Sequence, residues 1–311
     1  MHLKNWHLKN WKSQSLKTIQ ESMSDWSIQK LLNWICDYFT EKQVDSPRLS
    51  AELLLSEVLQ IPRINLYTNF DSNVSQDRLN ELHRLVKRCC EHEPLAHLIG
   101  RTEFYSLDIK VSSDCLIPRP ETELLVERAI GFLQNRDGPQ LVCDLCTGSG
   151  CVAVAIAVNF HDAQFIATDI CDAALSIAAK NVENHKLSER IKLVCGDLFD
   201  PIIEGIDETS FDLIVCNPPY VSADEYDKLD RNVKDYEPRK ALYAGNDGLD
   251  VYTRLIAQAD RFLKADGAMM LEIGYNQAEQ VNGLLEKTNA FAEIKIETDY
   301  ADNDRIAIAK K

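Results

Sequence analysis

Leu141-Val-Cys-Asp-Leu-Cys-Thr-Gly-Ser-Gly150 is an apolar run that ends in a glycine-rich turn, and a helical pattern follows it from about Cys151. The apolar run predicts a buried strand. Gly148 and Gly150 allow a tight turn and a close approach of the backbone to a ligand, with the free amides of a helix N-terminus behind them. With Ala153 the spacing is G-x-G-x-x-A, which is typical of a nucleotide-cofactor loop.

The pattern on the carboxyl side of this loop predicts an α/β fold with a doubly wound, mainly parallel sheet of seven strands and a Rossmann-like topology. Ligands in such sheets bind outside the carboxyl ends of the strands. The predicted strands are 141–145, 164–168, 191–195, 211–216 and 268–273, with 291–297 and 304–309 as a closing antiparallel pair, and the predicted helices are about 150–160, 172–184, 250–263 and 276–286.

The pattern on the amino side is helical. Apolar residues recur at helical spacing from Ser27, a second helix starts at Ser46-Pro47, and a third starts at Ser75. The stretch Thr102–Glu123 alternates apolar and polar residues around Ser112–Asp114, which predicts a β-hairpin between two domains. The predicted parts are a tail (1–22), a helical domain (23–100), a hairpin linker (101–123) and a sheet domain (124–311).

Composition excludes several classes of protein. With 45% hydrophobic and 27% charged residues, the 311-residue chain is neither disordered nor collagen-like. The net charge of −15 disfavours a general nucleic-acid binder. The first 22 residues hold four lysines and one acid and predict a disordered tail, which leaves −18 on the rest. No apolar run approaches the roughly 20 residues of a membrane span, and no secretory signal is visible.

Cysteine usage indicates a reducing compartment. The chain holds ten cysteines, and Cys143, Cys195 and Cys216 lie in strand-like runs, where a reduced thiol behaves as a small hydrophobe. Cys143-x-x-Cys146 has no second ligand pair at zinc spacing, so we expect no metal. We therefore expect a soluble, cytoplasmic protein with reduced cysteines.

Two carboxylates bear on the choice of cofactor. Asp169 ends the next strand, 19 residues after Gly150, and is placed for a ribose hydroxyl pair. By itself this fits both NAD and S-adenosyl-L-methionine. Asp144 ends the first strand, where its charge would oppose a pyrophosphate and favour the ammonium and sulfonium groups of the methyl donor. Asp144 favours S-adenosyl-L-methionine; the alternative is that it only caps the turn.

The most specific motif is Asn217-Pro218-Pro219-Tyr220 at the end of a strand. The two prolines fix φ and remove two amide donors. The Asn217 side-chain oxygen and the Pro218 carbonyl can each accept one N–H of a planar NH2 group, such as a carboxamide or an adenine amine, and hold it in line with a methyl–sulfur bond. Tyr220 can pack on the face of that group. The alternative is a tight turn without function.

At this point the chain resembles the PrmC/HemK protein-(glutamine-N5) methyltransferases, which act on peptide chain release factors. The resemblance runs from about Ser27 to Lys311. NPPY alone is shared with adenine-N6 methyltransferases, whereas LIPRPETE (Leu116–Glu123) together with EPRKAL (Glu237–Leu242) and GNDGL (Gly245–Leu249) is much narrower.

The resemblance implies the roles of particular residues. The donor-binding residues would be Asp144, Cys146, Thr147, Gly148, Ser149, Gly150, Asp169 at the ribose, Leu198 beside the adenine, and Asn217. The catalytic residues would be Asn217, Pro218 and Tyr220, with Pro219 completing the glutamine slot. Arg119, Glu121 and Glu123 would shape that slot or form a surface ion-pair cluster. Cys146 replaces the glycine usual in the family, which is tolerable if its φ is negative, and Leu198 stands where some members have tryptophan.

The implied activity is transfer of a methyl group from S-adenosyl-L-methionine to the glutamine of the GGQ motif in class 1 release factors, with the helical domain docking that protein. We expect a monomer with no direct nucleic-acid or membrane partner. Two alternatives share the chemistry. One is an adenine-N6 methyltransferase acting on DNA or RNA, which would need base extrusion and a basic channel. The other is a ribosomal-protein glutamine methyltransferase.

Overall fold

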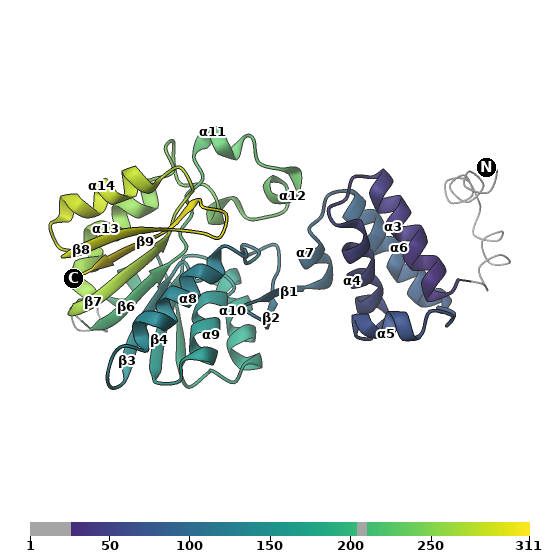
Figure 1. Cartoon of the computed structure of the whole chain (residues 1–311), viewed down its shortest axis with the longest axis horizontal. Helices are drawn as coiled ribbons and strands as arrows, with labels where there is room; N and C mark the ends of the chain where they lie inside the picture. The colour runs from purple at the N-terminus through teal and green to yellow at the C-terminus, as the bar shows by residue number, and fades with distance from the viewer. Residues whose placement is uncertain (1–25, 204–209) are drawn as a thin grey trace. The chain divides into compact units, whose positions relative to one another are not determined.

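A computed structural model describes residues 26–203 and 210–311 of the chain (Figure 1). The chain divides into two compact units between Ile99 and Gly100. The predicted tail, residues 1–22, lies outside the described residues. In the described part of the chain, no helix is long and apolar enough to cross a membrane.

The first unit is helical, as the spacing of its apolar residues predicts. Its helices are α3 (Ile28–Glu41), α4 (Pro47–Leu59), α5 (Arg63–Thr68), α6 (Gln76–Cys90) and α7 (Leu95–Ile99). The buried face of α3 contains Leu31, Ile35 and Phe39, which pack against apolar residues of α4 and α6. Pro47 stands at the first helical turn of α4, but Ser46 has φ +44° and its side chain makes no capping bond.

In the described residues, the second unit has a seven-stranded sheet in the order β5-β4-β3-β6-β7-β9-β8. The neighbours from β5 to β7 are parallel, and β9 is antiparallel to both β7 and β8. The predicted doubly wound sheet and its closing antiparallel pair are therefore confirmed. The strands are β3 (Gln140–Leu145), β4 (Ala163–Asp169), β5 (Ile191–Cys195), β6 (Phe211–Cys216), β7 (Leu263–Glu272), β8 (Glu293–Thr298) and β9 (Asp304–Lys310).

Helices cover both faces of this sheet, with α8, α9 and α10 on one face and α13 and α14 on the other (Figure 1). The longer helices are α8 (Thr122–Leu133), α9 (Cys151–Asn159), α10 (Asp172–Asn184), α13 (Asp250–Phe262) and α14 (Ala278–Thr288). Shorter helices are α11 (Ala223–Tyr226), α12 (Arg231–Lys234), η1 (Asp200–Ile202) and η2 (Arg239–Ala241). Side chains alternate along a strand, so Cys143 and Leu145 join the core with α13 and α14 while Asp144 points to the opposite face.

The hairpin is shorter than predicted, and its turn lies elsewhere. Strand β1 (Arg101–Phe104) pairs with β2 (Leu107–Lys110), and the turn is Tyr105–Ser106, not Ser112–Asp114. Both turn residues have positive φ, 50° and 60°, which matches the twist that a two-residue hairpin turn requires. The alternation of residues beyond Lys110 belongs to an irregular segment, 111–121, that leads to α8.

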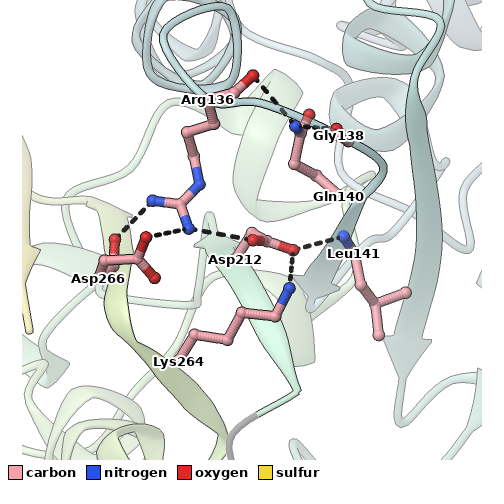
Figure 2. A network of polar contacts seen from close by, with 7 residues as sticks. All are labelled: Arg136, Gly138, Gln140, Leu141, Asp212, Lys264 and Asp266. Atoms are coloured by element: carbon pink, nitrogen blue, oxygen red, sulfur yellow. Dashed lines mark hydrogen bonds and ion pairs between the residues drawn. The ribbon is translucent and has the colours of Figure 1, made fainter.

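A polar network joins three strands at the end of the sheet where the parallel strands begin (Figure 2). The buried carboxylate of Asp212 on β6 accepts hydrogen bonds from the Leu141 amide at 2.8 Å, Lys264 Nζ at 2.8 Å and Arg136 Nη2 at 3.1 Å. Arg136 also pairs with Asp266, whose side chain is 74% exposed. Because Asp212 has three donors, its burial leaves no uncompensated charge.

Asp212→Ala should lower the free energy of unfolding by about 3 kcal/mol, because it leaves a buried amide and two cations without their acceptor. Urea unfolding followed by circular dichroism measures this loss. Asp266→Ala is the matched control, since it removes the exposed partner of the same arginine and should cost under about 1 kcal/mol. Equal losses of unfolding free energy in the two variants would contradict a stabilising role specific to Asp212.

Candidate active site

An open pocket of about 460 Å³ lies at the carboxyl ends of β3, β4, β5 and β6. Its walls come from the loops after these strands, from the segment before α8 and from residues 238–243. In the strand order, the chain leaves β3 toward β4 on one side and later returns to place β6 on the other. The pocket therefore lies at the point where the strand order reverses, which is where open α/β sheets bind ligands.

The glycine loop adopts the tight turn that its sequence predicts. Gly148 and Gly150 have φ of 54° and 78°, values that L side chains rarely adopt. A Cβ at Gly150 would also lie 3.1 Å from the Cβ of Ala178 on α10. The fully buried Asn181 of α10 donates to the Ser149 carbonyl at 2.8 Å and exchanges two hydrogen bonds with the Lys110 backbone, so one side chain holds the loop against the hairpin.

Asp144 lies at the base of the pocket and is 1% exposed. Its Oδ2 accepts a hydrogen bond from Thr147 Oγ1 at 2.6 Å and one from the Ala153 amide at 3.3 Å. Burial raises the pKa of Asp144 to about 7, although these two hydrogen bonds oppose the rise. The side chain thus makes a capping contact and also lines the pocket.

Asp169 presents a carboxylate at the end of β4. Its Oδ2 accepts from the Gly148 amide and its Oδ1 from the Cys171 amide, both at 2.8 Å. Burial raises its pKa, and the two amides oppose that shift. Each oxygen keeps a further lone pair. This arrangement suits a pair of ligand hydroxyls, and it also ties the glycine loop to β4.

The NPPY loop is held from two sides. Asn217 Nδ2 donates to Thr122 Oγ1 at 3.1 Å, so the acceptor left on this side chain is Oδ1. Gln277 Nε2 donates to the Tyr220 carbonyl at 3.0 Å and also to the Gly248 carbonyl. A Cβ at Gly248 would lie 2.3 Å from the Tyr220 carbonyl oxygen, and Gly248 has φ +77°, so only glycine fits there.

The pocket brings together many of the predicted site residues and leaves others outside. The predicted residues that line it are Asp144, Cys146, Thr147, Gly148, Ser149, Asp169, Leu198, Asn217 and Pro219. The predicted residues that are not part of its wall are Gly150, Pro218, Tyr220, Arg119 and Glu121. Tyr220 packs against the core instead, and its hydroxyl donates to Glu272 Oε1 at 3.3 Å.

The segment before α8 lines the pocket with several residues, but its predicted site residues make their contacts outside it. Arg119 pairs with the buried carboxylate of Glu237, which also accepts from the Ile117 amide at 3.0 Å. Glu121 is exposed, and Glu123 accepts from the Tyr105 amide at 2.7 Å, so it holds the hairpin turn. Thr122, the first residue of α8, reaches both the pocket and Asn217.

Other wall residues were not singled out from the sequence. Arg239 lines the pocket and lies over the rings of Tyr243 and Tyr226, with 4.5 and 5.1 Å from its guanidinium carbon to their centroids. Arg254 lines the pocket and pairs with Asp197. Arg239 lies in the EPRKAL motif and Asp197 precedes Leu198, so closeness in sequence to predicted site residues was the signal that could have found them.

The negative φ that would make a cysteine tolerable at position 146 is not observed, because the φ of Cys146 is +57°. The left-handed conformation costs a residue with a Cβ roughly 1–2 kcal/mol, which explains why glycine suits the position. In exchange, the side chain packs against the core cluster of the sheet and lines the pocket. The thiol of Cys146 also lies beside that of Cys216.

Cys146→Gly should therefore be more stable than Cys146→Ala by about 1 kcal/mol, because both lose the thiol but only alanine keeps the strained Cβ. Urea unfolding of the two variants measures the difference. Leu145, one residue earlier, lies in a strand, and there the order should reverse, with Leu145→Ala more stable than Leu145→Gly. Alanine proving the more stable residue at position 146 would rule out strain there.

Cys143 and Cys146 lie in different surroundings. Cys143 is fully buried in the core, and burial raises the pKa of its thiol well above the usual value, whereas Cys146 faces the pocket. Across residues 26–203 and 210–311, no group of three or more His, Cys, Asp or Glu side chains is placed to hold a metal ion.

The fold and the site define a methyltransferase. Residues 121–233 match the family model described as the methyltransferase small domain, and residues 30–100 match the PrmC N-terminal domain. The catalytic domain of hMettl16, solved in complex with the MAT2A 3′UTR hairpin 1, has a TM-score of 0.54 at 19% identity and covers 86% of this chain and 92% of its own. That likeness shows the fold alone.

Curated relatives identify the family more narrowly. The release factor glutamine methyltransferase of Rhodopirellula baltica is 41% identical over 291 residues, 92% of this chain and 97% of its own length. That of Geobacter sulfurreducens is 39% identical over 263 residues, 85% and 89% of the two chains. The chain belongs to the release factor glutamine methyltransferase family, which confirms the resemblance seen in its motifs.

Proposed function

We propose that this chain transfers a methyl group from S-adenosyl-L-methionine to the side-chain amide nitrogen of the GGQ glutamine in class 1 peptide chain release factors. The observation that carries the proposal is the state of Asn217 at the pocket wall. Its amide nitrogen is occupied by Thr122, so its oxygen is the atom available to a substrate N–H. Membership of the family supports the choice of substrate.

The donor half of the pocket fits S-adenosyl-L-methionine. Asp169 would hold the ribose hydroxyls, with Leu198 and Ile170 along the adenine, and Asp144 lies where a carboxylate would face the cationic end. Thr147, Gly148 and Ser149 would line the methionine part. When bound, the donor supplies a methyl group on a positively charged sulfur. The carboxylate of Asp144 favours this ligand over a dinucleotide, because it would oppose a pyrophosphate.

The acceptor half explains how an amide can be methylated. The nitrogen lone pair of a carboxamide is delocalised, so the nitrogen is a poor nucleophile. Asn217 Oδ1 and the Pro218 carbonyl would each accept one N–H, which orients the NH2 group and stabilises the positive charge that develops on it. The methylated nitrogen then loses a proton readily, so no residue is needed as a base before attack.

The same pair of acceptors suits the amine of adenine, so the substrate class rests on further observations. The net charge of −15 opposes an extended polyphosphate partner. The helical unit matches the PrmC N-terminal domain, and we propose that it docks the release factor. The cytoplasm is the proposed compartment and a monomer the proposed state.

A methyl-transfer assay tests the proposal. Purified enzyme receives tritiated methyl donor with, in parallel, a class 1 release factor, the same factor with its GGQ glutamine replaced by alanine, total RNA and DNA. We expect label only in the unmodified factor. Asn217→Ala should lower kcat by about 10²-fold or more with donor affinity retained, because an oriented acceptor is lost.

Asn276→Ala is the matched control for this assay, since Asn276 is an exposed asparagine whose amide nitrogen donates to Glu225. It should keep full activity. Label in DNA or RNA but not in protein would replace the proposed substrate with a nucleic acid. Full turnover of Asn217→Ala would refute the role of the amide oxygen.

Donor affinity should depend on pH through Asp144. Its pKa of about 7 means that the carboxyl group is largely protonated at pH 6, whereas a cationic ligand needs the carboxylate. Raising the pH from 6 to 8 removes that proton and should tighten donor binding by about tenfold. Calorimetric titration in buffers of different ionisation enthalpy should show proton release on binding at pH 6.

Asp144→Asn is the control for the pH dependence, because the side chain keeps its shape and an oxygen for Thr147 but loses its titration. Any pH dependence that comes from the donor's own amino group remains in this variant. An unchanged pH dependence in Asp144→Asn would show that Asp144 does not face the cation.

A further inference from the structure

Glu272 is a buried acid beneath the NPPY loop that the proposed reaction does not use. It ends β7, is 1% exposed and is not part of the pocket wall. Its Oε1 accepts a hydrogen bond from the Tyr220 hydroxyl at 3.3 Å. Its Oε2 receives no hydrogen bond of good geometry within the described residues, although the Thr122 hydroxyl approaches the carboxyl group and favours its ionised form.

Thr122 connects this acid to Asn217. A threonine hydroxyl has one hydrogen to donate and two lone pairs that accept. Because Asn217 Nδ2 donates to Thr122 Oγ1, the hydroxyl hydrogen must point away from Asn217. The acceptor beside this hydroxyl is the buried Oε2 of Glu272, which has no hydrogen bond of good geometry within the described residues. Donation from Asn217 to Thr122 therefore leaves the Thr122 hydrogen for Glu272.

We propose that Glu272 is a positioning residue that sets the orientation of the Asn217 amide. This inference rests on the proposed function, in which Asn217 Oδ1 accepts an N–H of the substrate amide. An ionised carboxylate only accepts hydrogen bonds, so it keeps the Thr122 hydrogen on its own side. Thr122 can then only accept from Asn217, and the Asn217 oxygen is turned to the substrate.

A neutral side chain at position 272 would no longer fix the direction of the Thr122 hydroxyl hydrogen. A glutamine amide can donate to Thr122 as well as accept from it, so Thr122 could donate to Asn217 Oδ1 instead. The Asn217 amide would then present its NH2 group to the NH2 group of the substrate. Two donors facing each other form no hydrogen bond, and the nucleophile loses its orientation.

Charged and titratable groups from each neighbouring element bear on the protonation of Glu272. Burial raises the pKa of Glu272. The hydroxyls of Thr122 and Tyr220 and the cation of Arg305 lower this pKa, and the charge of Glu121 raises it. The groups that face Glu272 are Arg305 on β9, Glu121 and Thr122 at the start of α8, Tyr220 after β6, Tyr252 on α13 and Cys151 on α9.

The test measures methyl transfer at saturating donor by Glu272→Gln, Thr122→Val and the double variant. We expect kcat to fall about tenfold or more in each single variant, with donor affinity unchanged. The double variant should be no slower than Thr122→Val, because both changes break one chain of hydrogen bonds. In the wild-type enzyme kcat should fall as the pH drops through the raised pKa of Glu272, and Glu272→Gln should lack this decline.

Tyr252→Phe is the matched control, because the Tyr252 hydroxyl donates to the backbone carbonyl of Glu272 at 2.9 Å and is equally buried. It disturbs the same residue without touching the carboxylate and should keep kcat. Multiplied losses in the double variant, a similar loss in Tyr252→Phe, or an acid decline that persists in Glu272→Gln would each overturn the inference. A wild-type enzyme that does not label the release factor would instead refute the proposed function.

Discussion

The parallel pairing of β3 with β6 is the contact on which the site depends. It places Leu145 opposite Cys216, so the residues that follow each strand, Cys146 and Asn217, emerge side by side. These strands adjoin in space although α9, α10 and two strands separate them along the chain. The glycine loop and the NPPY loop therefore share one pocket, and a slip in the register of this pair would separate the donor half from the acceptor half.

Buried carboxylates are treated differently at the two ends of the sheet. Asp212, where the parallel strands begin, is neutralised by Arg136 and Lys264 and serves stability. At the carboxyl ends, Asp144 and Glu272 have no ion-pair partner among the residues that the structure describes, and burial raises the pKa of each. An acid without a bonded cation is costly to bury, and buried acids of this kind are typical of functional sites.

Sequence reasoning predicted the sheet well because its strands are short and largely apolar, and β5 and β6 match the expected ranges although Lys192 and Asp212 interrupt their apolar runs. It missed α8, whose N-cap, Glu121, makes no side-chain cap bond and gives no start signal. It also missed Thr122, because the role of that hydroxyl depends on partners distant in the chain. The positive φ of Cys146 could not be predicted, because the backbone of the loop, and not the residue type, determines it.

Asn181 on α10 links the hairpin to the glycine loop. Its buried side-chain amide forms hydrogen bonds with the backbone of Lys110 on β2 and with the carbonyl of Ser149 in the glycine loop. If either segment shifts, the fully buried Asn181 side chain loses a hydrogen-bond partner. The hairpin and the glycine loop are therefore linked through α10, and Asn184 and His185 at the end of that helix also bond to the hairpin.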